Sequence, residues 1–422
     1  MKWWNKQQLY VQIFIGIVLG LIIGFTVGGQ VSFIMKPIGD VFLRLLMMLI
    51  APVVLFTIVS GITKMEDVKS LTSVGGKLLI YYTLTSVIAM VVAMVIGIVI
   101  DPGKDTPGLL SGVMDTTKAS KFSFVDNMIK WVPVNPFEAL ATGNVLQILF
   151  FSVFLGIALL LLRDKVKFVT QVVDQGAEVM LKITDMVMSL APYGILALVS
   201  EMVHSLSAKT LAEVGKFIAA DTLAMLALLI LVYPIQLKLM AGISPTRFYK
   251  AITPAILIAA STTSSAASLP VNLNVAEKNL KLPEKIYGFG LTVGATINSN
   301  GMAAALGVIC IFAANLFGMN LTLPMLFQFG LVGVLSSMGT AGVKGAGVVL
   351  SAILLQTMGL PLTLIPILAA IWPVIDIAHT TCNVVGDMVG VSIISAKAGE
   401  MDVKAFNENT VHEYTNAKAQ SE

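Results

Sequence analysis

Long apolar runs fill the first half of the chain. A helix of about 20 consecutive apolar residues crosses the hydrocarbon core of a bilayer. The runs consist mainly of Leu, Ile, Val and Ala and are separated by short polar stretches, so the pattern predicts a series of transmembrane helices. The predicted spans cover approximately residues 8–28, 40–63, 76–100, 144–162, 170–203 and 212–241.

The second half of the chain interrupts its apolar runs with polar residues and glycines. Segment 251–275 carries a Ser/Thr cluster at its centre and a proline behind it, and it is too short to cross a membrane twice. Segment 322–358 has the same design with a glycine-rich centre. Each pattern predicts a re-entrant hairpin, in which two half-helices meet at a polar tip. A third apolar span, between the two segments, is broken by Asn298, Ser299, Asn300 and Gly301.

The positions of lysine and arginine agree with hairpins that return to the side from which they enter. The loops around 318–322 and 357–362, on the opposite side, contain neither residue. The loop 101–143 is an exception with four lysines, but long loops obey the positive-inside rule poorly. We therefore expect the cytoplasm on the side of Lys2 and Lys6. The basic clusters expected there are Arg163/Lys165/Lys167, Lys238/Arg247/Lys250, Lys278/Lys281/Lys285 and Lys397/Lys404.

Composition agrees with a polytopic membrane protein. Mean hydropathy is +0.89, and 12% of residues are charged, against roughly 25% in soluble domains. The net charge of +3 comes from scattered loop residues, so nucleic acid is not an expected partner. Cys310 and Cys382 lie in apolar helical context, which favours small buried side chains over a disulfide or metal pair. The basic N-terminus is followed by an apolar run without a small-residue cleavage site, which predicts a first helix that is retained and not removed as a signal peptide.

The last apolar segment carries an unusual polar face at 376–387. At about 100° per residue, four of its polar side chains fall within about 60° of one another, over about 16 Å of helix. They are Asp376, Thr380, Asn383 and Asp387. Carboxylates in a membrane helix need positive charge nearby, and a Na⁺ ion with a substrate ammonium would supply it. The alternative is a polar seam between helices that binds no ligand.

Five motifs resemble the dicarboxylate/amino acid:cation symporter family, which includes the glutamate transporters. They are YYTLTS (81–86), TSSAASLP (263–270), GATINSNG (294–301), SMGTAGVKGAG (337–347) and DIAHTTCNVVGD (376–387). The resemblance implies an all-α polytopic membrane protein with eight transmembrane helices and two re-entrant helical hairpins. It also implies a homotrimer in the cytoplasmic membrane and an elevator mechanism, in which one domain moves against a scaffold.

The domain boundaries follow from the same resemblance. Scaffold helices are expected in 1–75 and, after the long loop, in 101–211. The transport domain is expected to combine the third helix, 76–100, with residues 212–397, and residues 398–422 form a cytoplasmic tail. Its two hairpins are expected at about 251–283 and 322–358.

The family pattern also assigns substrate-binding positions. Asp376 matches the residue that holds the substrate ammonium, while Thr380 and Asn383 match those at its amino-carboxylate end. Ser264 and Ser265 match the positions that bind the substrate carboxylate at the first tip. The complete set implied is Ser264, Ser265, Met302, Val343, Gly347, Asp376, His379, Thr380 and Asn383.

Three cation sites are implied in the same way. The first uses Asp387 with carbonyl groups of Gly294, Asn298 and Asn383. The second uses carbonyl groups of Thr296, Ser337, Met338 and Thr340. The third uses Tyr82, Thr85, Ser86, the Asn298 side chain and position 300, which is Asn300 here where the family has a carboxylate.

Two further departures from the pattern bear on the substrate. His379 stands where carriers of acidic amino acids have arginine, and a neutral imidazole cannot replace the guanidinium fork that grips a distal carboxylate. Met302 stands where threonine is usual. At about −60° from Asp376, His379 borders the polar face and is expected to look toward the substrate side chain. Lys344, at the second tip, could reach a distal anion instead, or could be a solvated loop lysine.

The expected function is symport of a small neutral or polar amino acid with Na⁺, with H⁺ as a further coupling ion left open. Its partners are a small-molecule substrate and membrane lipid, and no cofactor beyond the coupling ion is implied. One alternative is a symporter of acidic amino acids or C4-dicarboxylates that uses Lys344. A passive anion channel would need a continuous polar lining, of which 144–162 and 212–241 show little. An enzyme is not expected, because HExxH, GxSxG and paired His/Cys ligands are absent.

Overall fold

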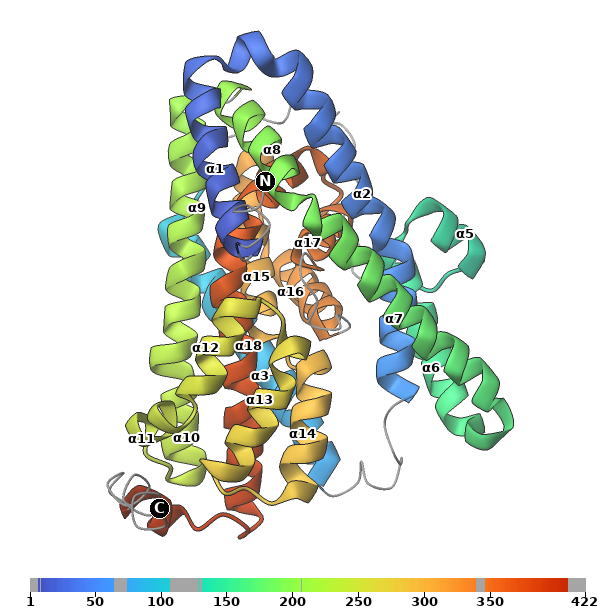
Figure 1. Cartoon of the computed structure of the whole chain (residues 1–422), viewed down its shortest axis with the longest axis vertical. Helices are drawn as coiled ribbons and strands as arrows, with labels where there is room; N and C mark the ends of the chain where they lie inside the picture. Colours follow the sequence, from blue (N-terminus) through green and yellow to red (C-terminus); the bar gives the residue numbers. More distant parts are fainter. Residues whose placement is uncertain are drawn as a thin grey trace.

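The computed structural model describes residues 7, 9–63, 74–106, 129, 131–205, 207–338 and 346–408. These residues form helices and contain no strand, as the apolar pattern predicts (Figure 1). The helices pack in two groups. One contains α1 (Leu9–Thr26), α2 (Gly28–Thr63), α6 (Val145–Leu162), α7 (Lys167–Ser189) and α8 (Ala191–Ser205), with the short α5 (Pro136–Thr142) and η5 (Arg163–Val166).

Two predicted boundaries in this first group differ from the structure. The helix expected at 40–63 begins at Gly28, because α2 continues through the polar residues between the predicted spans 8–28 and 40–63. The span expected at 170–203 is divided into α7 and α8, which meet at an angle of 54°. Pro192 follows the bend, at the second position of α8. In one continuous helix the proline would remove a backbone hydrogen bond, whereas the first turn of a new helix does not need its N–H.

Helix α1 packs against α8 through a row of glycines. A Cβ atom at Gly16, Gly20 or Gly24 would lie 2.5–2.8 Å from a backbone carbonyl oxygen of α8. Their spacing of four residues places the three glycines on one face of α1. The two backbones therefore lie in direct contact, as they do between membrane helices with small residues at the interface.

We expect Gly20→Leu to destabilise the protein, because the added side chain must push the two backbones apart. Overpacking of this kind costs about 1–3 kcal/mol. The measurement is thermal unfolding of the purified protein in detergent. Val18→Leu, which adds bulk to a more exposed position of the same helix, is the control. Equal melting temperatures for the two variants would contradict the close contact.

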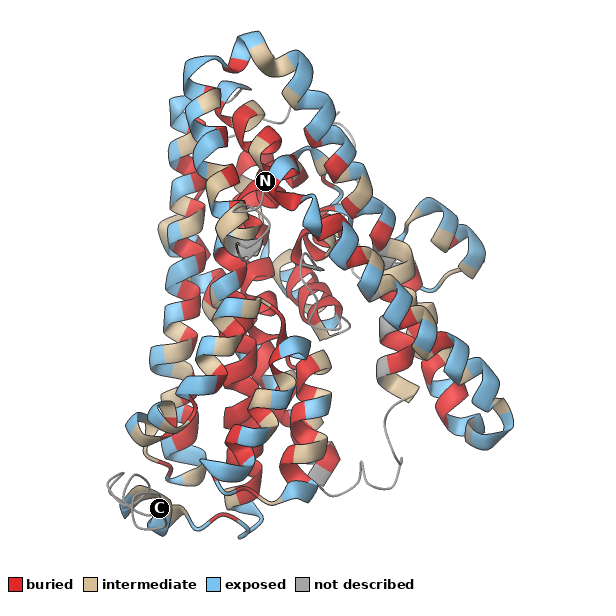
Figure 2. Ribbon diagram, in the orientation of Figure 1, coloured by how far each residue is buried: buried red, intermediate tan, exposed pale blue. Residues whose placement is uncertain are grey.

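The second group surrounds α18 (Ile365–Lys397) and includes α3 (Val74–Ile100), α9 (Ala208–Ala227), α14 (Glu284–Ile297) and α15 (Asn300–Phe317). Almost every residue of α15 is buried, as are most residues of α18 from Ile375 onward (Figure 2). The two cysteines, Cys310 of α15 and Cys382 of α18, are buried and not disulfide-bonded, as predicted.

A π-turn lies inside the predicted span 212–241. Helix α9 passes through η6 (Leu228–Val232), which is one turn of π-helix, into α10 (Tyr233–Ala241). Pro234 has no N–H to donate to the carbonyl group four residues earlier, and the wider turn accommodates it. The Tyr249 hydroxyl donates to the Leu229 carbonyl in this turn.

The segment predicted as the first hairpin is a pair of short helices, α12 (Thr253–Thr262) and α13 (Ser265–Lys278), which follow α11 (Pro245–Ala251). They pack side by side and are joined at Thr263, which has a left-handed backbone (φ +47°). At the open end, the Asn279 side chain donates to the Ala251 carbonyl at 2.7 Å, so the chain returns to where it started.

The second predicted hairpin is also built from two helices in contact, α16 (Leu323–Met338) and α17 (Ala346–Thr357). Its tip, 339–345, lies outside the described residues. The short η7 (Leu362–Leu364) leads from α17 into α18, and α19 (Val403–Glu408) follows α18.

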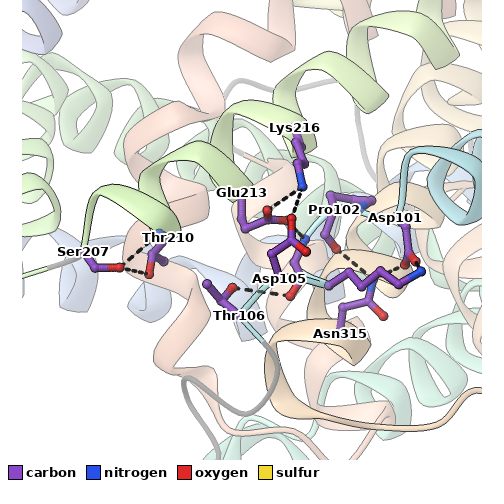
Figure 3. A network of polar contacts seen from close by, with 11 residues as sticks. Asp101, Pro102, Asp105, Thr106, Ser207, Thr210, Glu213, Lys216 and Asn315 are labelled. Atoms are coloured by element: carbon purple, nitrogen blue, oxygen red, sulfur yellow. Dashed lines mark hydrogen bonds and ion pairs between the residues drawn. The ribbon is translucent and has the colours of Figure 1, made fainter.

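Polar contacts join the helix ends at each end of the second group. At one end, Lys216 of α9 pairs with Asp105 at 2.6 Å and with Glu213 at 2.7 Å, and Glu213 accepts from the Gly103 N–H at 2.5 Å (Figure 3). Asn315 of α15 donates to Asp101 at 2.8 Å. These contacts, which we call the polar clamp, connect the end of α3 to the start of α9 and the end of α15.

The Asp105–Lys216 pair of the polar clamp stays ionised at neutral pH. The Lys216 ammonium donates a hydrogen bond to Asp105 and holds the pKa of that carboxyl below its usual value of 3.8. A lowered acid pKa contributes stability above the usual value, and the contribution is lost only as the pH falls through the lowered pKa. Changes of pH above about 5 therefore leave the Asp105–Lys216 pair intact.

Polar contacts at the opposite end involve Lys285, one of the basic residues that we expect on the cytoplasmic side. Lys285 pairs with Glu400 at 2.6 Å, and the Ser244 N–H donates to the Asn407 side chain at 2.8 Å. The residue before α11, the start of α14 and the residues after α18 are therefore brought together at this end.

Five helical segments among the described residues are long and apolar enough to cross a membrane, and a sixth is added if the bent pair α7–α8 counts as one span. The apolar segments Val11–Thr26 and Phe150–Leu162 are shorter. The architecture is that of a polytopic membrane protein, and the number of eight spans stays a prediction. The five segments are Gly28–Ser60, Gly75–Ile100, Ala208–Ala241, Glu284–Phe317 and Leu362–Lys397.

Candidate functional site

The break between α14 and α15 lies against the polar face of α18. Asn298 and Ser299 leave helical geometry (φ −86°, ψ 82° and φ −109°, ψ 55°), which releases backbone groups from the helical hydrogen-bond pattern. The break is buried within the protein, where unwound backbone at membrane depth is tolerated. The predicted interruption of this helix is therefore present at Asn298 and Ser299, while Asn300 and Gly301, which we expected to belong to it, already lie in α15.

Asp387 and Asn298 form the centre of the first predicted cation site. The Asn298 amide donates to Asp387 Oδ1 at 2.8 Å and to the Asn383 carbonyl at 3.3 Å. Asp387 Oδ2 and Asn298 Oδ1 are buried and accept no hydrogen bond. None of the ion pairs between described residues includes Asp387. Two unpartnered buried oxygen atoms beside an uncompensated carboxylate fit a hard monovalent cation, which supplies both the charge and the missing contacts.

Glycines allow the helices to approach closely around this centre. A Cβ atom at Gly294 would lie 2.5 Å from Asp387 Oδ1, and one at Gly386 would lie 2.6 Å from the Asn300 amide nitrogen. At Gly390, a Cβ atom would lie 2.6 Å from the Tyr82 ring. Tyr82 in turn donates to the Gly290 carbonyl at 3.0 Å. Among the predicted first-site residues, Gly294, Asn298, Asn383 and Asp387 are thus brought together.

Two residues predicted for the third cation site, Ser86 and Asn300, belong to a chain of hydrogen bonds that ends at the Cys382 carbonyl. Ser86 donates to Asn300 Oδ1 at 2.9 Å, and the Asn300 amide donates to the Tyr233 hydroxyl at 3.1 Å. That hydroxyl donates to the Cys382 carbonyl at 2.9 Å. Thr85 donates within its own helix. Asn300, which replaces a carboxylate in the family pattern, therefore has partners for its amide oxygen and nitrogen.

The second predicted cation site is only partly described. α14 and α16 are in contact, which brings the helices that carry Thr296, Ser337 and Met338 together. Ser337 is buried and its hydroxyl donates to the Val334 carbonyl at 2.8 Å. Thr340 lies outside the described residues.

The predicted substrate-binding residues of α18 and the first tip are buried. Ser264 caps α13 by accepting from the Ala267 N–H at 3.3 Å, and α12 and α13 both contact α18. Asn383 Oδ1 accepts from the Gly301 N–H at 2.8 Å, which ties the polar face of α18 to the start of α15. Buried together in this region are Ser264, Ser265, Met302, Asp376, Thr380 and Asn383.

The second hairpin contributes one described residue, Gly347 at the start of α17, to the predicted substrate-binding set. A Cβ atom at Gly347 would overlap the Trp372 indole, so α17 packs directly on α18 at this position. Val343 and Lys344 lie outside the described residues. The role predicted for Lys344 therefore stays a prediction.

His379 does not take the orientation expected from the helical angle. Its Nε2 lies 2.9 and 2.8 Å from the two carboxylate oxygen atoms of Asp221 on α9, and both side chains are fully buried. The Trp372 ring lies beside the imidazole, with 5.3 Å between ring centroids. The hydrogen bond to Asp221, which the helical angle of α18 alone cannot reveal, therefore directs this ring toward α9.

Asp221 and Tyr233 are the two site residues that the sequence reasoning missed. Both lie in the predicted span 212–241, which seemed to have little polar lining, yet Glu213, Asp221 and Gln236 are buried there. An ionisable residue within a membrane span is a candidate functional residue by default. Asp221, in the middle of an apolar run, carried that signal.

Comparisons with known proteins agree with these features. The family model of the sodium:dicarboxylate symporter family matches residues 9–397. The chain is 32% identical over 392 residues to the proton/sodium-glutamate symport protein of Bacillus caldotenax, with 91% of each chain covered. It is 29% identical to the C4-dicarboxylate transport protein of Erwinia tasmaniensis, with 91% of this chain and 92% of the relative covered. It is 28% identical to the L-cystine uptake protein TcyP of Bacillus cereus, with 88% and 83% covered.

Proposed function

Because the chain belongs to the sodium:dicarboxylate symporter family, and is thus a multi-pass membrane transporter and not an enzyme, we propose that it couples Na⁺ to the uptake of a small neutral or polar amino acid. The observation that carries the coupling is the uncompensated Asp387 carboxylate beside the unpartnered Asn298 oxygen. A Na⁺ ion there neutralises Asp387, and Asp376 is the residue that we assign to the ammonium group of the substrate.

The first cation site is the one that we assign to Na⁺ with its ligands Gly294, Asn298, Asn383 and Asp387. The chain around Asn300 is better regarded as a polar connection, because Ser86 and Tyr233 already bind its amide. The second site, with Thr296, Ser337, Met338 and Thr340, is retained as a further candidate.

The substrate class follows from His379. In acidic-amino-acid carriers this position holds arginine, whereas here the imidazole is engaged by Asp221 and directed toward α9. No described lysine or arginine forms an ion pair in this buried region, which leaves a distal carboxylate without a bidentate partner. A small side chain without charge is the better fit.

The two packing groups suggest how transport occurs. We assign α1, α2, α5, α6, α7 and α8 to a scaffold in a homotrimer of the cytoplasmic membrane. Large apolar side chains such as Phe33 and Phe154 are exposed on the scaffold, where they would face lipid or neighbouring subunits. The helices around α18, with both hairpins re-entering the membrane, form the moving part of an elevator.

A symporter of acidic amino acids or C4-dicarboxylates is the second candidate, and the names of the relatives favour it. A passive anion channel is less well supported. The buried polar residues of α9 are committed to protein partners, Glu213 to Lys216 and Asp221 to His379, and so line no continuous path.

Uptake by the purified protein in liposomes tests the proposal. Labelled serine, alanine, cystine, aspartate and succinate would be offered with an inward Na⁺ gradient, with an inward K⁺ gradient as the control. We expect serine or alanine to accumulate above the external concentration with Na⁺ alone. Preferred uptake of aspartate or succinate would select the second candidate, and equilibration without accumulation would select a channel.

We expect His379→Arg alone to gain little aspartate uptake. The guanidinium would remain paired with Asp221 and would not reach a substrate carboxylate, since an oppositely charged buried partner holds it at close range. His379→Arg combined with Asp221→Asn should gain more, with about tenfold higher aspartate uptake than either single variant. Equal aspartate uptake by the single and double arginine variants would show that Asp221 does not restrain this position.

A further inference from the structure

Asp221 and His379 form an isolated charged pair in the protein interior. Of the ion pairs between described residues, it is the one in which both side chains have 0% exposure. Asp221 lies 13 residues after the start of α9 at Ala208, which places it about 20 Å along the helix and far from either end of the span. The cost of a carboxylate at such a depth requires a compensating charge.

Few other ionisable groups act on this pair. The charges that act on the His379 ring are those of Asp221 and, from α18 itself, Asp376. The charge of Asp221 also acts on the buried Cys382 thiol of α18. On α8, Glu201 accepts a hydrogen bond from Ser32. Helices α12, α16 and α17 contain no Asp, Glu, Lys, Arg or His, and α15 adds only Cys310 to the titratable groups.

A proton is therefore the cation that fits the pair. With the imidazole neutral, Asp221 leaves one net negative charge in the interior; with the imidazole protonated, the pair is neutral overall. The contact with the carboxylate fixes Nε2 as the donor. Nδ1 is buried without a hydrogen-bond partner, so its lone pair is the open position for the added proton.

We propose that Asp221 and His379 form a proton-binding site that is loaded and emptied during transport. The proton adds to Nδ1 from water on one side of the membrane, the ring becomes an imidazolium bound to Asp221, and the proton returns to water on the other side. This inference deepens the proposed function and rests on it, because the proton moves with the substrate and Na⁺.

The position of the pair connects it to the substrate region. The His379 backbone packs on Gly301, where a Cβ atom would overlap it, and the Gly301 N–H donates to Asn383. Asp376 lies one turn earlier on α18 and acts on the imidazole through its charge. A substrate ammonium at Asp376 and an imidazolium at His379 therefore influence each other, which is the condition for coupling.

Proton movement during uptake tests the site. Liposomes with the wild-type protein would contain a fluorescent pH indicator and receive an inward Na⁺ gradient with labelled serine, or the amino acid of the panel with the largest Na⁺-driven uptake. We expect the lumen to acidify with about one proton per substrate. We also expect an external pH of 6 against an internal pH of 7.5 to raise uptake several-fold, a range in which the Asp105–Lys216 pair stays ionised.

Asp221→Asn and His379→Gln are the test variants, and both keep a hydrogen-bonding side chain of similar size. In each, the Na⁺-driven uptake that remains should proceed without acidification, with a proton-to-substrate ratio near zero. Glu213→Gln, on the same helix as Asp221, and His204→Gln, the other described histidine, are the matched controls and should keep the wild-type ratio. The ratio is independent of the uptake rate, so a partial loss of activity does not obscure it.

The outcomes separate this inference from the proposed function. Na⁺-driven uptake without acidification in the wild type would overturn the proton site and leave the symporter intact. An unchanged ratio in Asp221→Asn or His379→Gln would also overturn it. If both variants fail to fold, wild-type acidification alone decides, with its absence again against the site. Uptake that ignores Na⁺ altogether would instead overturn the proposed function.

Discussion

Replacement of Asp387 by asparagine is expected to raise the Na⁺ concentration for half-maximal uptake about 100-fold, which corresponds to roughly 2.7 kcal/mol. The change removes the charge of a buried carboxylate that no described lysine or arginine neutralises, while the Asn298 hydrogen bond retains an oxygen acceptor. The measurement is uptake as a function of external Na⁺. Glu213→Gln, which neutralises a buried carboxylate outside the site, should leave the Na⁺ dependence unchanged.

Stability gives an independent measure of the same site. Without Na⁺, Asp387 is a buried carboxylate with no ion-pair partner among the described residues, so Asp387→Asn should raise the melting temperature by a few degrees. Addition of NaCl should stabilise the wild type, because an ion that binds only the folded protein shifts unfolding by mass action. The variant should lack this shift. A wild-type-like response to Na⁺ would remove Asp387 from the cation site.

Replacement of Asp376 by alanine is expected to lower amino-acid uptake at least 100-fold. The carboxylate is the group assigned to the substrate ammonium, and hydrogen bonds to charged groups contribute about 1.5–3 kcal/mol, with more lost when the partner charge is left buried. The measurement is initial uptake against substrate concentration. Thr381→Ala is the control on the same helix, since the Thr381 hydroxyl donates to the Ile377 carbonyl within α18.

The same variant discriminates between substrate classes. A dicarboxylate without an amino group has no ammonium for Asp376 to hold, so Asp376→Ala should spare its transport. Succinate uptake that survives in this variant would favour the C4-dicarboxylate candidate. Loss of all uptake together with normal folding would favour an amino acid.

The helical content and the broken segments could be predicted from the sequence because they depend on local pattern. Each of these patterns is contained in a stretch of about 20 residues or fewer: the single apolar runs, the Ser/Thr cluster near residue 263 and the Asn298–Gly301 break. The close set of Asn298, Asn383 and Asp387 was predictable for another reason. Asn383 and Asp387 share one helical face, and the family motif at 294–301 supplies Asn298. In the structure the three residues lie near one another.

The orientation of His379 could not be predicted because its partner lies 158 residues earlier. A helical angle places a side chain on a face but does not say which neighbour competes for it. The bend at Leu190 and the π-turn at 228–232 follow the same rule. Both precede prolines, but whether a proline ends, bends or widens a helix depends on the helices packed around it.

The glycine row of α1 has a consequence for how the protein is made. Gly20 contacts Leu196, so its partner is 196 − 20 = 176 residues later in the chain. At about 5–20 residues per second, synthesis of that stretch takes roughly 10–35 s. Throughout this time the glycine face of α1 has no α8 to pack against. Its docking onto α8 is therefore a late step of biogenesis, limited by lateral encounter of two inserted helices within the bilayer.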